Sequence, residues 1–99
     1  MEKSIPEIQA RVLHGLGSIM QYFNEFERGR KLAKESLNIW RELNNIREQA
    51  FVLAQIAMLY SGNPADLETR LSYIESAFDI ARQLGNPGLI NHCLISLCN

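Results

Sequence analysis

The octapeptide ARVLHGLG at residues 10–17 returns, 40 residues later, as AFVLAQIA at residues 50–57. Both copies have a small residue at each end and a Val-Leu pair at the third and fourth positions. A third, partial copy, NHCLISLC, occupies residues 91–98, which lie 41 residues beyond the second. Self-similarity at a constant spacing of this length is typical of stacked structural repeats, so the sequence predicts a repeat architecture.

Length and composition are those of one small globular domain. The chain has 99 residues, of which 46% are hydrophobic, and a net charge of −1. A charge so close to zero produces no field that would attract nucleic acid or an acidic membrane. No apolar run approaches the roughly 18 residues of a membrane span, and the polar start MEKS lacks the apolar core of a signal peptide. We therefore expect a cytoplasmic protein that contacts neither nucleic acid directly nor membrane.

Apolar residues recur at helical spacing throughout the chain, and no segment alternates for long as a strand does. Asn24 and Asn45 are each followed, three residues later, by a Glu, which is the pattern of a capping box. Pro64 fits the first position of a helix, where its missing N–H does no harm. These signals predict five helices, at about 5–22, 25–43, 46–61, 64–84 and 87–98.

Short loops require consecutive helices to run antiparallel, so we predict an all-α array of helical hairpins in a single domain. Repeat 1 spans about 5–44, repeat 2 about 45–85, and a partial third repeat about 86–99. Small residues fall where the two helices of a hairpin should approach each other, namely Gly17, Gly29, Ser36, Ala57 and Ala77. Arg70 occupies the position equivalent to Gly29, which predicts a more open second hairpin or a shifted register there.

Several of these residues resemble the tetratricopeptide repeat family. The matches are Leu16-Gly17, the turn NEFER at residues 24–28, ESL at 35–37, RELNN at 41–45, and Tyr60. The period of 40–41 residues exceeds the ~34 residues usual for the family. It is similar to the longer repeats in the C-terminal halves of bacterial signalling ATPases and of transcriptional regulators of the maltose-activator type. The chain has no P-loop and no basic recognition helix of its own.

The resemblance implies an α-solenoid that serves as a protein-interaction scaffold in a signalling or transcription-regulating protein. In the family, the first helices of successive hairpins line a concave face that binds a partner. The matching positions here are Arg11, His14, Ser18, Gln21, Phe51, Ala54, Met58, Ser61, His92, Ile95 and Asn99. They include no cluster of Lys, Arg and Asn able to hold a peptide's terminal carboxylate. A segment with apolar anchors is therefore the expected partner. The alternative is a structural spacer within a nucleotide-driven switch, with no separate ligand.

No catalytic, cofactor or metal site is expected, so the sequence does not indicate an enzyme. The helix of His14 offers no carboxylate within two turns after it to orient a catalytic base, and this residue is either a polar contact of the groove or an ordinary exposed histidine. Cys93 and Cys98 lie five residues apart, which is neither a metal pair nor a redox motif. Trp40 and Tyr73 are interpreted as packing residues.

The basic segment from Arg28 to Lys34 is interpreted as a solvated helix face, because Lys31 lies four residues from both Glu27 and Glu35 and can pair with them. Phosphate contact is the alternative.

The last 17 residues, which follow Arg82, contain no Asp, Glu, Lys or Arg. Apolar residues are spread around the predicted helix 87–98, whereas an exposed terminal helix should have one polar face. Either the chain is a fragment of a longer array, or this end is covered by another copy. The second possibility predicts a homodimer through Leu89, Ile90, Leu94 and Ile95.

Overall fold

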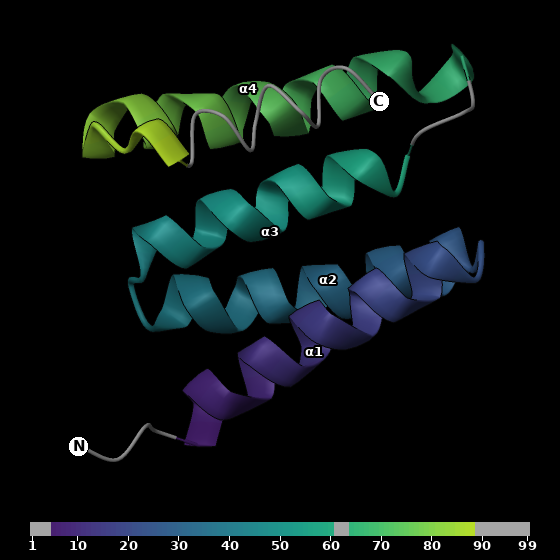
Figure 1. Ribbon diagram of the computed structural model, residues 1–99, viewed down its shortest axis with the longest axis horizontal. Helices are drawn as coiled ribbons and strands as arrows, with labels where there is room; N and C mark the ends of the chain where they lie inside the picture. Colours follow the sequence, from purple (N-terminus) through teal and green to yellow (C-terminus); the bar gives the residue numbers. More distant parts are fainter. Residues whose placement is uncertain (1–4, 61–63, 89–99) are drawn as a thin grey trace.

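The computed structural model describes residues 5–60 and 64–88, and these residues form helices and turns without any strand (Figure 1). The helices are α1 (Ile5–Tyr22), α2 (Phe26–Glu42), α3 (Ile46–Met58) and α4 (Leu67–Leu84). A 3-10 turn, η1 (Pro64–Asp66), precedes α4. The all-α prediction is confirmed, and each of these four helices begins and ends within three residues of its expected bounds. The fifth predicted helix, 87–98, lies outside the described residues except for its first two positions.

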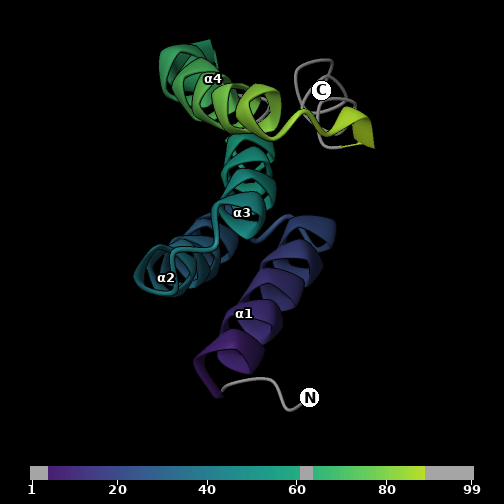
Figure 2. The ribbon, with the colours of Figure 1, turned by 90° about the vertical axis from the view of Figure 1, so that its left-hand side faces the viewer.

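Consecutive helices run antiparallel and form two hairpins, α1–α2 and α3–α4 (Figure 1). Seen end-on, α3 lies between α4 on one side and the α1–α2 pair on the other (Figure 2). This central position explains the composition of α3, in which residues 52–57 are all buried. A helix packed on several sides needs apolar residues around most of its circumference, as the stretch AFVLAQIA supplies.

Three of the helices end in the same hydrogen-bonded turn. After α1, the N–H of Glu25 donates to the carbonyl of Met20 at 2.8 Å, and Asn24 has a φ of +61°. Asn44 and Gly85 take the same left-handed conformation after α2 and α4, with φ of +57° and +59°. This is the Schellman motif, in which a left-handed residue allows the last helical carbonyls to be satisfied. Asn and Gly are the residues that adopt this conformation at least cost.

The helix starts agree with the expected capping boxes in one case of two. Asn45 caps α3, because its side chain accepts a hydrogen bond from the N–H of Glu48 at 3.2 Å. The expectation for Asn24 is wrong: the N-cap of α2 is Glu25, and it makes no side-chain cap. Asn24 instead ends α1, since a left-handed turn residue cannot also provide the extended backbone of an N-cap.

The small residues lie where helices cross, as predicted. A Cβ atom added to Gly29 would lie 2.7 Å from Cδ2 of Leu59 and 3.3 Å from the carbonyl oxygen of Gly17. Ser36 is fully buried and its hydroxyl donates to the carbonyl of Ala10 at 2.7 Å, which joins α2 to α1. In the second hairpin, Ala57 and Ala77 are also fully buried.

Arg70 is half-buried at the position that corresponds to Gly29. The second hairpin accommodates this long side chain while α3 and α4 remain packed through Ala50, Ala77 and Ala81, all of which belong to the core.

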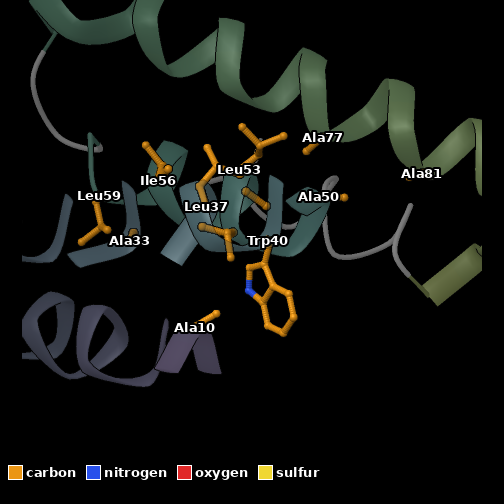
Figure 3. Close-up of a cluster of buried hydrophobic side chains, with 12 residues drawn as sticks. Ala10, Ala33, Leu37, Trp40, Ala50, Leu53, Ile56, Leu59, Ala77 and Ala81 are labelled. Atoms are coloured by element: carbon orange, nitrogen blue, oxygen red, sulfur yellow. The ribbon is translucent and has the colours of Figure 1, made fainter. Parts of the chain in front are cut away.

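The core lies between α2, α3 and α4, with Ala10 contributed by α1 (Figure 3). Trp40 is its largest fully buried side chain, with only 1% of its surface exposed. Tyr73 packs against the same core and stacks on Tyr60, with ring centroids 5.9 Å apart. The interpretation of Trp40 and Tyr73 as packing residues is therefore confirmed.

Candidate functional site

Two residues expected on the partner-binding face, Arg11 and Ser18, contact α3 through their side chains, but their partners there are Glu48 and Gln55. Arg11 of α1 forms ion pairs with Glu7 on its own helix, at 3.6 Å, and with Glu48 of α3, at 3.7 Å. Its guanidinium also lies over the ring of Trp40, 5.4 Å from the centroid. Arg11 thus bridges three helices, and its charge is already engaged by two carboxylates of the same chain.

Gln55 makes the second connection between α1 and α3. Its Nε2 donates to the carbonyl of His14 at 2.8 Å and to the hydroxyl of Ser18 at 2.9 Å, and its side chain is buried. The Ser18 hydroxyl in turn donates to the carbonyl of His14 at 3.4 Å. Gly17 makes room for this amide, because a Cβ at that position would lie 3.1 Å from Nε2.

Gln55 is not among the residues that the repeat pattern predicted for the site, although the sequence carries a signal for it. It is the one polar residue in the stretch AFVLAQIA, which is otherwise apolar. A polar side chain in such a run is tolerated only when it finds hydrogen-bond partners, and a partner on a neighbouring helix was to be expected.

Replacing Gln55 with leucine should weaken the attachment of α1. The change removes the two hydrogen bonds from Gln55 to α1, although the His14 carbonyl keeps the Ser18 hydroxyl as a donor. It also removes a buried amide oxygen, Oε1, that has no partner among the described residues. We expect a loss of about 1–2 kcal/mol, because two interhelical hydrogen bonds are lost and each contributes roughly 0.5–1.5 kcal/mol. Urea denaturation measures this loss of stability.

Gln49→Leu is the matched control, since the Gln49 side chain makes a long hydrogen bond of 3.4 Å to the Trp40 carbonyl. Equal midpoints for the two variants would contradict the role of Gln55.

The other predicted face residues are distributed as follows. Phe51 and Met58 on α3 and Gln21 on α1 are half-buried, as is His14. Phe51 and Met58 are seven residues apart, so they lie on one face of α3, and every residue between them is buried. His92 and the four residues expected to mediate self-association, Leu89, Ile90, Leu94 and Ile95, lie outside the described residues.

The basic segment of α2 takes part in packing. Arg30 donates to the carbonyl of Leu59 at 2.9 Å and its guanidinium lies 4.6 Å from the ring centroid of Tyr60. Lys34 donates to the hydroxyl of Tyr60 at 3.2 Å. The expected pairs of Lys31 with Glu27 and Glu35 are not among the ion pairs of the described residues. Arg30 is half-buried, whereas Arg28, Lys31 and Lys34 are exposed, so most of this segment faces solvent as expected while Arg30 and Lys34 also contact the end of α3.

Within residues 5–60 and 64–88, no three His, Cys, Asp or Glu side chains gather as a metal site would require. The helices in the same ranges are too short or too polar to cross a bilayer. Comparison with family models, with curated proteins and with solved structures finds no match to this chain.

Proposed function

We propose that the protein is an interaction scaffold that binds a segment of another protein along α1 and α3. The observation that carries this proposal is the pair Phe51 and Met58. They are partly open to solvent on one face of α3, although the six residues between them are buried. Apolar side chains seven residues apart are suitable anchors for an extended or helical segment.

Fixed contacts next to this pair and between its two members support the proposal. The ion pair of Arg11 with Glu48 and the hydrogen bonds of Gln55 hold α1 against α3, so the face is organised before a partner arrives. Such preorganisation reduces the entropy lost on binding. Because Arg11 is engaged by Glu7 and Glu48, the face offers an acidic segment little uncompensated positive charge. An apolar or mixed segment suits it better.

In this proposal the chain catalyses no reaction and needs no cofactor. The resemblance of its repeats to those of bacterial signalling ATPases and transcriptional regulators supports a cytoplasmic role within a signalling or transcription-regulating protein. The tetratricopeptide-like α-solenoid, continued by a fifth helix at 87–98, is part of the same proposal.

Met58→Gln is the variant that tests the binding face. Peptides selected from a random displayed library on the parent protein serve as probes, and their affinity is then measured by titration calorimetry. We expect the variant to bind at least ~10-fold more weakly, because burying a Met side chain contributes roughly 1.5–3 kcal/mol. Lys31→Gln on the exposed side of α2 is the control and should bind normally.

Arg11 is a poor probe of the same face. Arg11→Glu would place three carboxylates together with Glu7 and Glu48, so it would disturb the α1–α3 contact as well as any binding. Amide chemical shifts provide the independent measurement. Changes on peptide addition should include His14, Gln21, Phe51 and Met58. Changes confined to Arg28, Lys31 and Lys34 would assign binding to the opposite side of the molecule and overturn the proposal.

A further inference from the structure

Helix α1 carries most of its large apolar side chains on the face turned away from the rest of the protein. Together with the residue that follows the helix, these side chains form the α1 stripe, which comprises Ile5, Ile8, Val12, Leu16, Ile19, Tyr22 and Phe23, each between 38% and 82% exposed. The opposite side of the helix is buried and carries the small residues Ala10 and Gly17. A surface helix normally turns its largest apolar side chains inward, so α1 has the reverse arrangement.

The α1 stripe is large enough to be a protein interface. Taking about 200 Å² for a fully exposed side chain of this size, its seven residues expose roughly 800 Å². The largest apolar patch of an ordinary monomer covers ~300–600 Å². A standard interface buries about 800 Å² on each partner. Figure 2 shows α1 at the edge of the array, with α2 and α3 beside it on one side only.

The spacing of the stripe indicates that its partner is a helix lying along the whole of α1. Positions separated alternately by three and four residues are Ile5, Ile8, Val12, Gly15, Ile19 and Tyr22. This alternation is the a and d pattern of a coiled-coil seam. Gly15 leaves open space at the middle of the seam, because no heavy atom lies within 4 Å of the place where its Cβ would be.

A second copy of α1 fits this seam in the antiparallel direction. With a two-fold axis near residues 13 and 14, the layers pair Ile5 with Tyr22, Ile8 with Ile19, and Val12 with Gly15 of the other copy. Each Val12 then fills the space beside a Gly15, so large and small side chains alternate across the contact. No stripe residue is charged, so two copies meet there without repulsion.

We propose that the protein forms a two-fold homodimer in which the α1 stripes of two copies pack antiparallel. The interface is isologous, because the same residues are contributed by both copies. It is distinct from the face of Phe51 and Met58 on α3, so a dimer would present two binding faces. It also differs from the self-association surface at Leu89, Ile90, Leu94 and Ile95 that the sequence led us to expect.

The first test is the mass of the full chain in solution by sedimentation equilibrium. The parent should associate to twice its 11.3 kDa. Val12→Glu/Ile19→Glu should raise the dissociation constant at least ~100-fold, since each dimer would bury four unpaired carboxylates. Its helical circular dichroism should be unchanged, because both positions are exposed. Leu94→Glu/Ile95→Glu is the control and should remain dimeric. A monomeric parent, or dissociation caused only by the control, would overturn the proposal.

The second test reports the direction of packing and does not depend on a destabilising charge. Ile8→Cys and Ile19→Cys are prepared in a Cys93→Ser/Cys98→Ser background. Under oxidation, a mixture of the two proteins should form a disulfide-linked dimer, because these positions share a layer. Neither protein alone should do so. In an antiparallel dimer the two residues at position 8 lie far apart, and so do the two residues at position 19. If each variant formed disulfide-linked dimers by itself and the mixture formed none between the two variants, the helices would be parallel. That result would exclude the antiparallel dimer.

Discussion

Gly29→Leu should destabilise the protein by about 3 kcal/mol, because the added side chain would enter a close crossing of α2 with α1 and the end of α3. Its Cβ alone would lie 2.7 Å from Cδ2 of Leu59, a fully buried residue, and 3.3 Å from the backbone oxygen of Gly17, which cannot turn away as a side chain can. Relief requires α1 and α2 to separate, which would also strain the bond from Ser36 to the Ala10 carbonyl. The fluorescence of Trp40, which is buried and the only tryptophan, would follow unfolding in urea.

Two alanine variants separate this steric effect from helix propensity. Gly15→Ala lies in open space and should stabilise the protein by up to ~1 kcal/mol, the propensity difference between the two residues. Gly29→Ala gains the same propensity but meets Leu59, so it should be destabilising. Gly17→Leu should resemble Gly29→Leu, because it would displace the side chain of Gln55. The stabilities of all these variants are measured at a protein concentration too low for association. Equal midpoints for Gly15→Ala and Gly29→Ala would disprove the close crossing.

Local sequence signals predicted the helices well because helix boundaries depend on neighbouring residues. Apolar spacing placed the four described helices, and the side chain of Asn45 caps α3 as its sequence context suggests. The error at Asn24 has a physical origin. Asparagine is favoured both as an N-cap and as a left-handed residue that ends a helix, and the sequence around Asn24 permits either. Only the backbone, with a φ of +61°, decides between them.

The candidate site depended on contacts between distant residues, and the sequence predicted these less completely. The repeats predicted that α1 and α3 are the first helices of two hairpins, and the described helices form those hairpins. They did not reveal that Glu48 would pair with Arg11 or that Gln55 would reach the backbone of His14. Both contacts require the relative rotation of two helices, which hydrophobic periodicity does not specify. The same rotation decides that the α1 stripe faces outward, although the spacing of its residues was visible in the sequence.

The rotation of α1 also connects the two proposed surfaces. Arg11 and Gln55 hold α1 to α3, while α2 packs on α1 at Ala10 and Gly17, and these contacts together leave the apolar side of α1 outward. A single set of interhelical bonds therefore positions both the face of Phe51 and Met58 and the α1 stripe. A variant that loosened α1 should weaken peptide binding and dimer formation together, whereas Met58→Gln and Val12→Glu/Ile19→Glu should each affect one of them.

Trp40→Ala is such a variant, and it should have the largest effect of those considered, about 3–5 kcal/mol. The indole is 1% exposed, belongs to the core cluster with Ala10 of α1, and supports the guanidinium of Arg11. Trp40→Phe should cost much less, because the indole Nε1 has no hydrogen-bond partner among the described residues and only volume is lost. Leu43→Ala, at an exposed position just after α2, is the control and should stay below ~1 kcal/mol. Urea midpoints measure the stabilities of these three variants.

Amide hydrogen exchange in Trp40→Phe should show α1 losing protection before α3, since α1 lies at the edge of the array. Equal loss of protection in both helices would mean that α1 is not held separately through Trp40 and Arg11.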